Sequence, residues 1–340
     1  MPISAEDAAR IYDEAIVIDM TCPLLREARY VDWCREGRMT AVAPTITGMS
    51  GNASTGFSLV GGWLRYERER SHDTLIVREA ADFARAKAEG KLGLVLHCQG
   101  TDLIEDKLDL VEAYHAAGLR VVQLTYNRKN LVGDGASERT NAGLSDFGVG
   151  LVKRLNQLRM AVDCAHTGLQ TSYDAIEASD APVIISHANA RGVHDSRRNI
   201  PDDLIRAIAE TGGVIGSVGF PPLLEWKGQP SMDRFLDDIA YKVDLVGIDH
   251  VGLGIDYYLG QHPVEDLETA TARYNSLVAA GLWRPGEYPP PPYIYPEGIE
   301  TPQTLFNLGP ALAARGFSEE EMRKILGGNW VRVLGDIWGG

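Results

Sequence analysis

The chain has few cysteines, a deficit of positive charge and no long hydrophobic run. Its four cysteines, Cys22, Cys34, Cys98 and Cys164, form no CxxC pair and are too sparse for a disulfide framework, which suits a reducing compartment. Because 33 basic residues face 47 acidic ones, the charge of -14 argues against nucleic acid or an anionic membrane as a partner. Neither a membrane span nor the apolar core of a signal peptide is present, so we expect a cytoplasmic protein.

Eight short apolar segments follow one another along the chain, most of them separated by segments with helical spacing. The expected helices include residues 5–15, 108–118, 146–158 and 202–211. Strands that alternate with helices predict an α/β protein, and eight of them predict a (β/α)8 barrel of the TIM type. A doubly wound open sheet is the alternative. The predicted strands cover residues 15–18, 41–46, 92–98, 119–125, 160–166, 182–187, 214–218 and 251–256.

The composition indicates a single barrel domain over residues 1–340, because 44% hydrophobic residues can bury a large core. We expect the Gly/Ser-rich segment 48–62 to be a loop and the charged segment 66–92 to be a solvated helix. Residues 257–301 are rich in Pro, Tyr and Trp and follow the last strand, so we expect a lid over the barrel mouth or a subunit contact. A closing helix pair is predicted for residues 318–338.

Two histidines stand at the ends of neighbouring predicted strands. His166 ends the apolar run from Met160, and His187 ends the run from Pro182, with a helix-like segment between them. A strand, a crossover helix and a parallel strand fit this spacing and place both imidazoles at the same end of the sheet. Because α/β barrels carry their chemistry at that end, the sequence predicts a metal-dependent, or formerly metal-dependent, barrel enzyme.

Four motifs occur in order: DCAHTG at 163–168, SHANARGVHDSRRNIPDD at 186–203, VGIDHVGLGID at 246–256 and GGNWVRVL at 327–334. Together they resemble the membrane (renal-type) dipeptidases, peptidase family M19 of the amidohydrolase superfamily, over most of the chain. The resemblance implies a barrel with a two-zinc centre that hydrolyses dipeptides, including some with a D-residue at the second position. It also makes a homodimer the expected assembly.

The chain departs from the family pattern at three metal-binding positions. The family's first strand ends in a His-x-Asp pair, and the corresponding residues here are Thr21 and Pro23. The glutamate that bridges both zinc ions in the family is replaced by Gln99. Two cations a few ångströms apart repel each other and are held together by shared carboxylates. A binuclear centre is therefore not expected in this chain.

Four residues match functional positions of the family, and a fifth stands at such a position with a different side chain. His166 and His187 match the histidines of the second zinc, and Asp256 matches the aspartate that handles the attacking water. Arg198 matches the arginine that holds the substrate carboxylate. Tyr126 stands where many relatives have a histidine near the reacting carbonyl. The resemblance thus retains the substrate side and half of the metal site.

One zinc ion held by His166 and His187 is the predicted cofactor, with no bound metal as the alternative. Asp256 would complete three protein ligands, and Gln99 could add a weak carbonyl ligand. His97 lies on the same strand face as Gln99 and is either a further ligand or, as the favoured interpretation, a hydrogen-bonded histidine inside the barrel.

These residues predict a metal-dependent hydrolase with a reduced, mononuclear centre, acting on a dipeptide or another small amide that carries a carboxylate. Asp256 would act as general base and then general acid, while Arg198 would hold the carboxylate. Two alternatives stay open, a binding protein that has lost hydrolysis and a lyase or isomerase of a related metabolite. The replacements at Thr21, Pro23 and Gln99 favour these alternatives.

Overall fold

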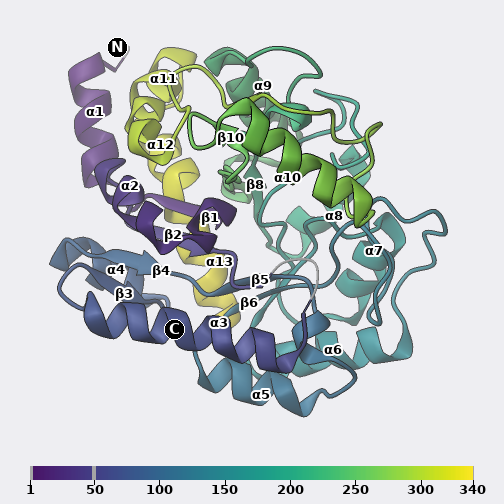
Figure 1. Cartoon of the computed structure of the whole chain (residues 1–340). Helices are drawn as coiled ribbons and strands as arrows, with labels where there is room; N and C mark the ends of the chain where they lie inside the picture. Colours follow the sequence, from purple (N-terminus) through teal and green to yellow (C-terminus); the bar gives the residue numbers. More distant parts are fainter. Residues whose placement is uncertain (1–2, 48–50, 340) are drawn as a thin grey trace.

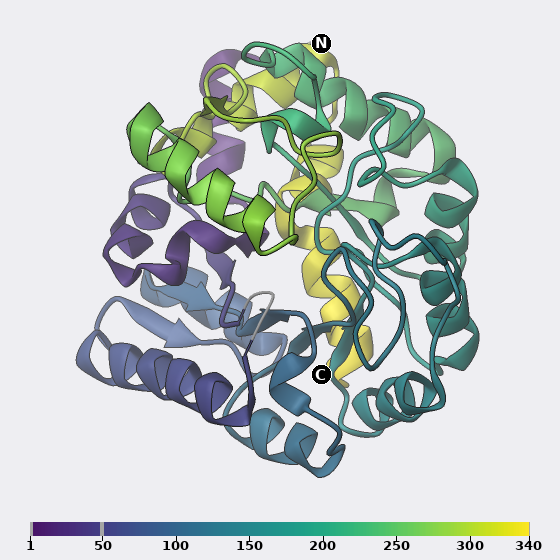
Figure 2. The ribbon, with the colours of Figure 1, turned by 45° about the vertical axis from the view of Figure 1, so that its right-hand side comes forward.

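The computed structural model describes residues 3–47 and 51–339. Its strands are parallel and lie at the centre, and helices surround them (Figure 1). The figure turned by 45° shows the same arrangement, with the C-terminal helix α13 passing close to the strands (Figure 2). Among the described residues, no helix combines the length and the hydrophobicity that crossing a bilayer requires.

The central strands form two sheets that isolated bridges join. One sheet has the order β3-β4-β2-β1-β9-β8, and the other has the order β5-β6-β7. Parallel bridges link Thr45 to His97, Asp163 to Ile184, and Ile185 to Ile215. These bridges connect both edges of the smaller sheet to the larger one, so that the strands follow one another around a ring. The strands are β1 Ile18–Cys22, β2 Ala41–Pro44, β3 Thr74–Ile76, β4 Leu92–Leu94, β5 His97–Gln99, β6 Val121–Gln123, β7 Ala161–Asp163, β8 Ile215–Ser217, β9 Val251–Leu253, β10 Gln261–His262 and β11 Tyr293–Ile294.

The helices follow the strands as the apolar spacing predicts. Ser4, Ser145 and Ser318 each accept a hydrogen bond from a backbone N–H of the first helical turn, and so fix where α1, α6 and α12 begin. The helices are α1 Ala5–Glu14, α2 Val31–Glu36, α3 Ala53–Glu69, α4 Ala81–Glu89, α5 Asp109–Ala116, α6 Asp146–Gln157, α7 Leu169–Ala178, α8 Asp202–Glu210, α9 Met232–Val246, α10 Leu267–Ala279, α11 Leu308–Arg315, α12 Glu319–Arg323 and α13 Asn329–Trp338.

The predicted α/β barrel class is confirmed, with corrections at several elements. The first strand is β1, which begins at Ile18 rather than at residue 15, and the strand predicted at 92–98 is divided into β4 and β5. Residues 182–187 contribute isolated bridges instead of a full strand. The predictions for 48–62 and 66–92 were wrong in part, because α3 covers 53–69 and β3 interrupts the charged segment. Residues 48–50 lie outside the described residues.

A second apolar cluster joins alternate strand residues to the closing helix α13. Ile18, Ala41 and Ala161 belong to this cluster, together with Trp330 and Val333 of α13. Residues two apart on a strand face the same side, so this cluster is distinct from the one that packs against the outer helices. The indole of Trp330 is fully buried and donates to the carbonyl of Leu253 at 3.0 Å, which fixes α13 against β9.

A buried ion pair fastens α9 to the chain segment that follows His187. Lys242 and Asp238 are both fully buried, and their side chains lie 2.7 Å apart. The ammonium also donates to the carbonyl of Ala188 at 3.1 Å, and the carboxylate accepts the N–H of Ala190 at 2.7 Å. The pair therefore satisfies backbone groups next to the predicted site.

Replacing Lys242 by Met should lower the free energy of unfolding by roughly 3 kcal/mol, because a buried carboxylate loses its counter-charge. The double variant Lys242→Met/Asp238→Asn should lose less. Urea denaturation monitored by circular dichroism measures both values, and the substitution Lys153→Met at an exposed lysine is the control. A Lys242→Met variant as stable as this control would contradict the assigned role of the pair.

Candidate functional site

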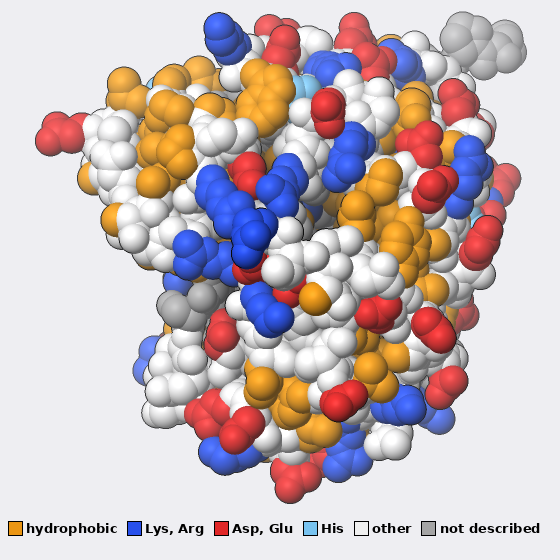
Figure 3. Space-filling model, turned by 90° about the vertical axis from the view of Figure 1, so that its right-hand side faces the viewer, with side chains coloured by type: hydrophobic (Ala, Val, Ile, Leu, Met, Phe, Trp, Pro, Cys, Tyr) orange, Lys and Arg blue, Asp and Glu red, His pale blue; other side chains and the backbone are white. Residues whose placement is uncertain are grey.

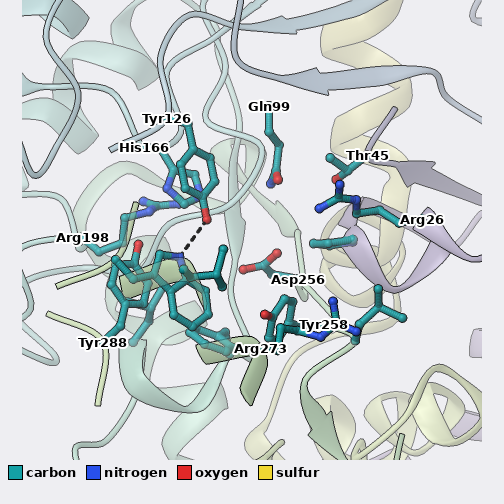
Figure 4. A pocket seen from close by; sticks show the side chains of 16 residues that line it. Arg26, Thr45, Gln99, Tyr126, His166, Arg198, Asp256, Tyr258, Arg273 and Tyr288 are labelled. Atoms are coloured by element: carbon teal, nitrogen blue, oxygen red, sulfur yellow. Dashed lines mark hydrogen bonds between the residues drawn. The ribbon is translucent and has the colours of Figure 1, made fainter. Parts of the chain in front are cut away.

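A cavity at the carboxyl ends of the strands brings most of the predicted site residues together. Gln99 and His166 face it from the strand ends, and α10 with the chain after it covers one side (Figure 4). The cavity has about 720 Å³ of empty space, part of it open to solvent. Of the residues predicted from the sequence, those that line the cavity are Gln99, Tyr126, His166, Arg198 and Asp256.

His187 lies directly behind this lining. Its ring centroid is 4.8 Å from that of His166, and its Nε2 atom is 3.3 Å from the amide nitrogen of Gln99. The backbone approaches closely here, since a Cβ atom on Gly216 or Gly254 would overlap the carbonyl oxygen of Ser186. Glycine at both positions therefore allows the segment with His187 to lie against its neighbours.

Two site residues occupy a backbone conformation that side chains seldom adopt. His166 has a φ angle of 57° and Asp256 one of 64°, both in the left-handed region. Each such non-glycine residue costs on the order of 1 kcal/mol, and such residues concentrate at functional sites. The observed strain supports a functional role for both strand ends.

The hydrogen bonds around His187 determine which ring nitrogen carries the proton. Its Nδ1 atom lies 2.7 Å from the Ser186 hydroxyl and 3.1 Å from the Thr21 hydroxyl. Both hydroxyl protons are used elsewhere, because Ser186 donates to Asp163 at 2.6 Å and Thr21 donates to the carbonyl of Met20 at 2.6 Å. Nδ1 must therefore be the donor, and Nε2 is left as an acceptor for the Gln99 amide.

The ring of His166 is fixed in the same tautomer. Its Nδ1 atom lies 2.7 Å from the amide oxygen of Asn127, which can only accept, so Nδ1 carries the proton. The ring of Tyr126 stacks on the imidazole at a centroid distance of 4.0 Å. Burial, reinforced by the Arg198 guanidinium, lowers the pKa of both His166 and His187 well below the usual range. Both imidazoles are neutral, with Nε2 unprotonated.

Neutral imidazoles with unprotonated Nε2 atoms are the form that binds a metal, although Nε2 of His187 accepts the Gln99 amide in this structure. The remaining donors do not fit two ions, because Thr21, Pro23 and Gln99 supply no carboxylate. In the part of the chain that the structure describes, no group of three or more His, Cys, Asp or Glu side chains could hold an ion. His166 and His187 thus offer two nitrogen donors, which suffice for at most one ion, and Asp256 does not complete a group of three with them as the sequence predicted.

His97 does not contribute to this donor set. Its Nε2 atom lies 3.0 Å from the carboxylate of Asp163, and both side chains are fully buried. His97 is therefore a hydrogen-bonded histidine inside the barrel, which is the interpretation that the sequence favours.

Asp256 presents a carboxyl group to the cavity. Its backbone is held by the N–H bond to the Thr21 carbonyl at 2.9 Å and by the Tyr295 hydroxyl, which donates to the Asp256 carbonyl. No described residue donates a hydrogen bond to its side chain. Burial raises the pKa of Asp256 to about 8, although the Arg198 guanidinium lowers it in part. Such a group can exchange a proton near neutral pH.

A backbone carbonyl holds the Arg198 side chain in place, and one of its N–H groups is left to bind a ligand. Arg198 is 4% exposed and donates through Nη2 to the carbonyl of His187 at 2.9 Å. Its Nε atom has no partner among the described residues, which leaves a buried donor for a ligand. Arg197, its neighbour, is exposed and donates to the carbonyls of Ala136 and Glu138.

Sequence reasoning missed Asn127, Arg26 and the aromatic residues that segment 257–301 brings to the cavity. Trp283 and Tyr288 stack at 4.6 Å, and Trp283 donates to the Tyr126 hydroxyl at 3.1 Å. The richness of this segment in Tyr and Trp was the available signal for the aromatic residues. Asn127 directly follows Tyr126 in the chain, but nothing in its local sequence indicates a bond to His166.

Comparison with known proteins agrees with this geometry. The sequence model of the family described as membrane dipeptidase (peptidase family M19) matches residues 63–286, more than half of the chain. The chain belongs to this family. The membrane dipeptidase family is thus confirmed as the one that the four motifs indicate.

Relatives support the assignment over most of the chain's length. A dipeptidase of Claviceps purpurea is 27% identical over 77% of this chain and 55% of its own. An amidohydrolase from Pseudomonas aeruginosa has a TM-score of 0.87 at 30% identity and covers 98% of this chain and 99% of that one. A metallopeptidase from Rhodobacter sphaeroides, liganded with a phosphinate mimic of the dipeptide L-Ala-D-Ala, shares the fold, with a TM-score of 0.79 at 22% identity, over 95% of this chain and 100% of that one.

The Asp256→Asn variant should gain stability over the wild type as the pH rises. The pKa of Asp256 lies at about 8 in the folded chain, above its ordinary value of 3.8, so the folded state keeps a proton that the unfolded state loses. Wild-type stability therefore falls between about pH 4 and pH 8, and the variant lacks this loss.

Thermal unfolding at pH 5 and pH 8 measures the effect. The difference in unfolding free energy between variant and wild type should grow by at least about 1 kcal/mol over this interval. The exposed exchange Asp195→Asn serves as control. A difference that stays constant or shrinks would contradict the raised pKa.

Proposed function

We propose that the chain hydrolyses the amide bond of a small substrate that carries a carboxylate, such as a dipeptide. The observation that carries this proposal is the Asp256 carboxyl group, which faces the cavity without a hydrogen bond from any described residue and lies in the field of Arg198. Membership in the membrane dipeptidase family, and relatives that are named dipeptidases, support hydrolysis as the reaction.

In this proposal Asp256 moves the proton. Its carboxylate accepts a proton from water as the water oxygen bonds to the amide carbon, which gives a tetrahedral intermediate. The same group then donates this proton to the amide nitrogen, and the C–N bond breaks to release an amine and a carboxylate. Arg198 binds the substrate carboxylate through the guanidinium group that keeps a free donor.

Tyr126 would stabilise the substrate carbonyl. Its hydroxyl already accepts the Trp283 N–H, so its own proton is free to be donated toward the cavity. Burial raises the pKa of Tyr126 well above its usual value, which keeps this proton in place. A hydrogen bond to the developing oxyanion would strengthen as the intermediate forms.

A single zinc ion is part of the proposal. His166 and His187 would hold it through Nε2, with Gln99 as a weak third ligand, and the bound ion would polarise the carbonyl or its own water ligand. The proximity of the Arg198 cation limits the affinity for any ion. The single-domain boundaries, the lid role of residues 257–301, the homodimer and the cytoplasmic location stay predictions.

Protein purified without chelators should contain about one zinc ion per chain, and the His187→Ala variant should lose both the metal and hydrolysis. Elemental analysis together with amine release from a panel of dipeptides and N-acyl amino acids measures this, and the substitution of the exposed His72 by Ala is the control. Wild-type protein with neither metal nor hydrolysis would overturn the proposal. Ligand binding without turnover would favour the binding-protein alternative.

The specificity constant kcat/KM should rise with pH, because burial raises the pKa of Asp256 and this group must lose its proton before it can act as a base. A bound cation would bring the midpoint below the pKa of about 8 that holds for the metal-free site. The Asp256→Asn exchange should lower kcat by at least about 100-fold and remove this pH dependence. Steady-state kinetics between pH 6 and pH 9 tests both expectations. A flat profile in the wild type would assign the proton transfer to another group.

A further inference from the structure

The cavity carries more positive than negative charge. The guanidinium groups of Arg26, Arg198 and Arg273 line it, and the only carboxyl group in the described lining is that of Asp256. Arg273 is compensated from outside the lining, since it forms an ion pair with Glu265. Arg198 and Asp256 line the same cavity, so their charges offset each other when Asp256 is ionised. Arg26 then remains as an excess charge.

Arg26 differs from the other arginines around it. It is the last residue of the 3-10 turn Pro23–Arg26, which follows β1, and Figure 4 shows its guanidinium group directed into the cavity opposite Arg198. No described carboxylate lies within 4.0 Å of it, whereas the nearby Arg29 pairs with Glu27 at 2.5 Å. Arg26 is exposed to solvent, where an arginine without an ion pair is ordinary, so it is its direction into the cavity opposite Arg198 that indicates a place for a ligand anion.

One face of the molecule has a local excess of basic side chains. Figure 3 shows Lys and Arg side chains gathered near a hollow in the middle of one face, although the chain as a whole is acidic. Local positive potential of this kind raises the encounter rate with anions at low ionic strength.

We propose that the substrate is a small amide with two anionic groups and no free ammonium group, and that Arg26 determines this specificity by binding the second anion. The inference rests on the proposed hydrolase function and names its substrate class. An acyl amino acid with an acidic side chain fits this description. Arg198 takes one carboxylate, Arg26 takes the side-chain carboxylate or a phosphate, and the acyl part lies against the aromatic wall of Trp283 and Tyr288.

An ordinary dipeptide fits less well for a reason of charge. Its free ammonium group needs an anionic partner, and in the described lining only Asp256 is available, which the proposed reaction uses for proton transfer. The same ammonium group would also be repelled by the two cavity arginines. Blocking it with an acyl group removes both costs.

Binding of matched ligands tests the inference. We would titrate the wild type, Arg26→Gln and Arg29→Gln with N-acetylglutamate, with its neutral isostere N-acetylglutamine, and with N-acetyl-O-phosphoserine, using D and L forms and isothermal calorimetry. The wild type should prefer N-acetylglutamate to N-acetylglutamine by about tenfold or more. Arg26→Gln should reduce this ratio to within about threefold, and Arg29→Gln, which removes the same charge outside the cavity, should keep it.

Tighter binding of the phosphoserine derivative would identify phosphate as the second anion. Equal binding of the two isosteres by the wild type, an unchanged preference in Arg26→Gln, or no binding of any probe would overturn the inference. Amine release from the same amides separates it from the proposed function. A preference for the charged ligand without turnover would contradict the proposed hydrolase function but support the role of Arg26. Turnover without a preference for the charged ligand would contradict only the role of Arg26.

Discussion

The buried carboxylate of Asp163 holds three strand ends in one arrangement. One of its oxygens accepts the N–H groups of Ala165 and Ser186 at 2.9 Å each, and the other accepts the Ser186 hydroxyl at 2.6 Å and His97 at 3.0 Å. It thereby ties β5 and β7 to the segment with His187, where the ladder consists of isolated bridges. Because Ser186 gives its proton to Asp163, the imidazole of His187 must donate to Ser186. The Asp163 carboxylate thus determines the tautomer of His187, although it forms no hydrogen bond with that imidazole.

Two of the three positions that depart from the family's metal-binding pattern are hydrogen-bonding partners of His187. Thr21 contacts Nδ1 of His187 and Gln99 contacts Nε2, while Asn127, in the loop after β6, fixes His166. A neutral hydroxyl and a neutral amide hold an imidazole in orientation without the negative charge that a second cation needs. The barrel can therefore keep the orientation of His166 and His187 although it lacks the carboxylates of the family's metal site. The positive charge of the cavity now comes from arginines.

The strained backbone at two site residues and the covering segment 257–301 complete the site. The left-handed backbone at His166 and Asp256 turns both side chains toward the cavity, and the surrounding hydrogen bonds offset its cost. Segment 257–301 supplies the aromatic wall and, through Trp283, leaves the Tyr126 proton free to point at a substrate. A partly covered, largely apolar cavity strengthens each of the few charges inside it. The proposed proton transfer by Asp256 and the proposed anion binding by arginine would both depend on that cover.

The sequence by itself determined the alternation of strands and helices, the placement of His166 and His187 at the ends of apolar segments, and the loss of family metal ligands at Thr21, Pro23 and Gln99, where relatives have one histidine and two carboxylates. These features depend on local periodicity and on residue type, which a single sequence displays. Tertiary structure alone decided how the ring of strands closes, where α3 and β3 lie, which nitrogen of each imidazole carries its proton, and that Arg26 shares a cavity with Arg198. Each of these depends on contacts between residues far apart in the chain, whose distance and hydrogen-bond geometry no local pattern encodes.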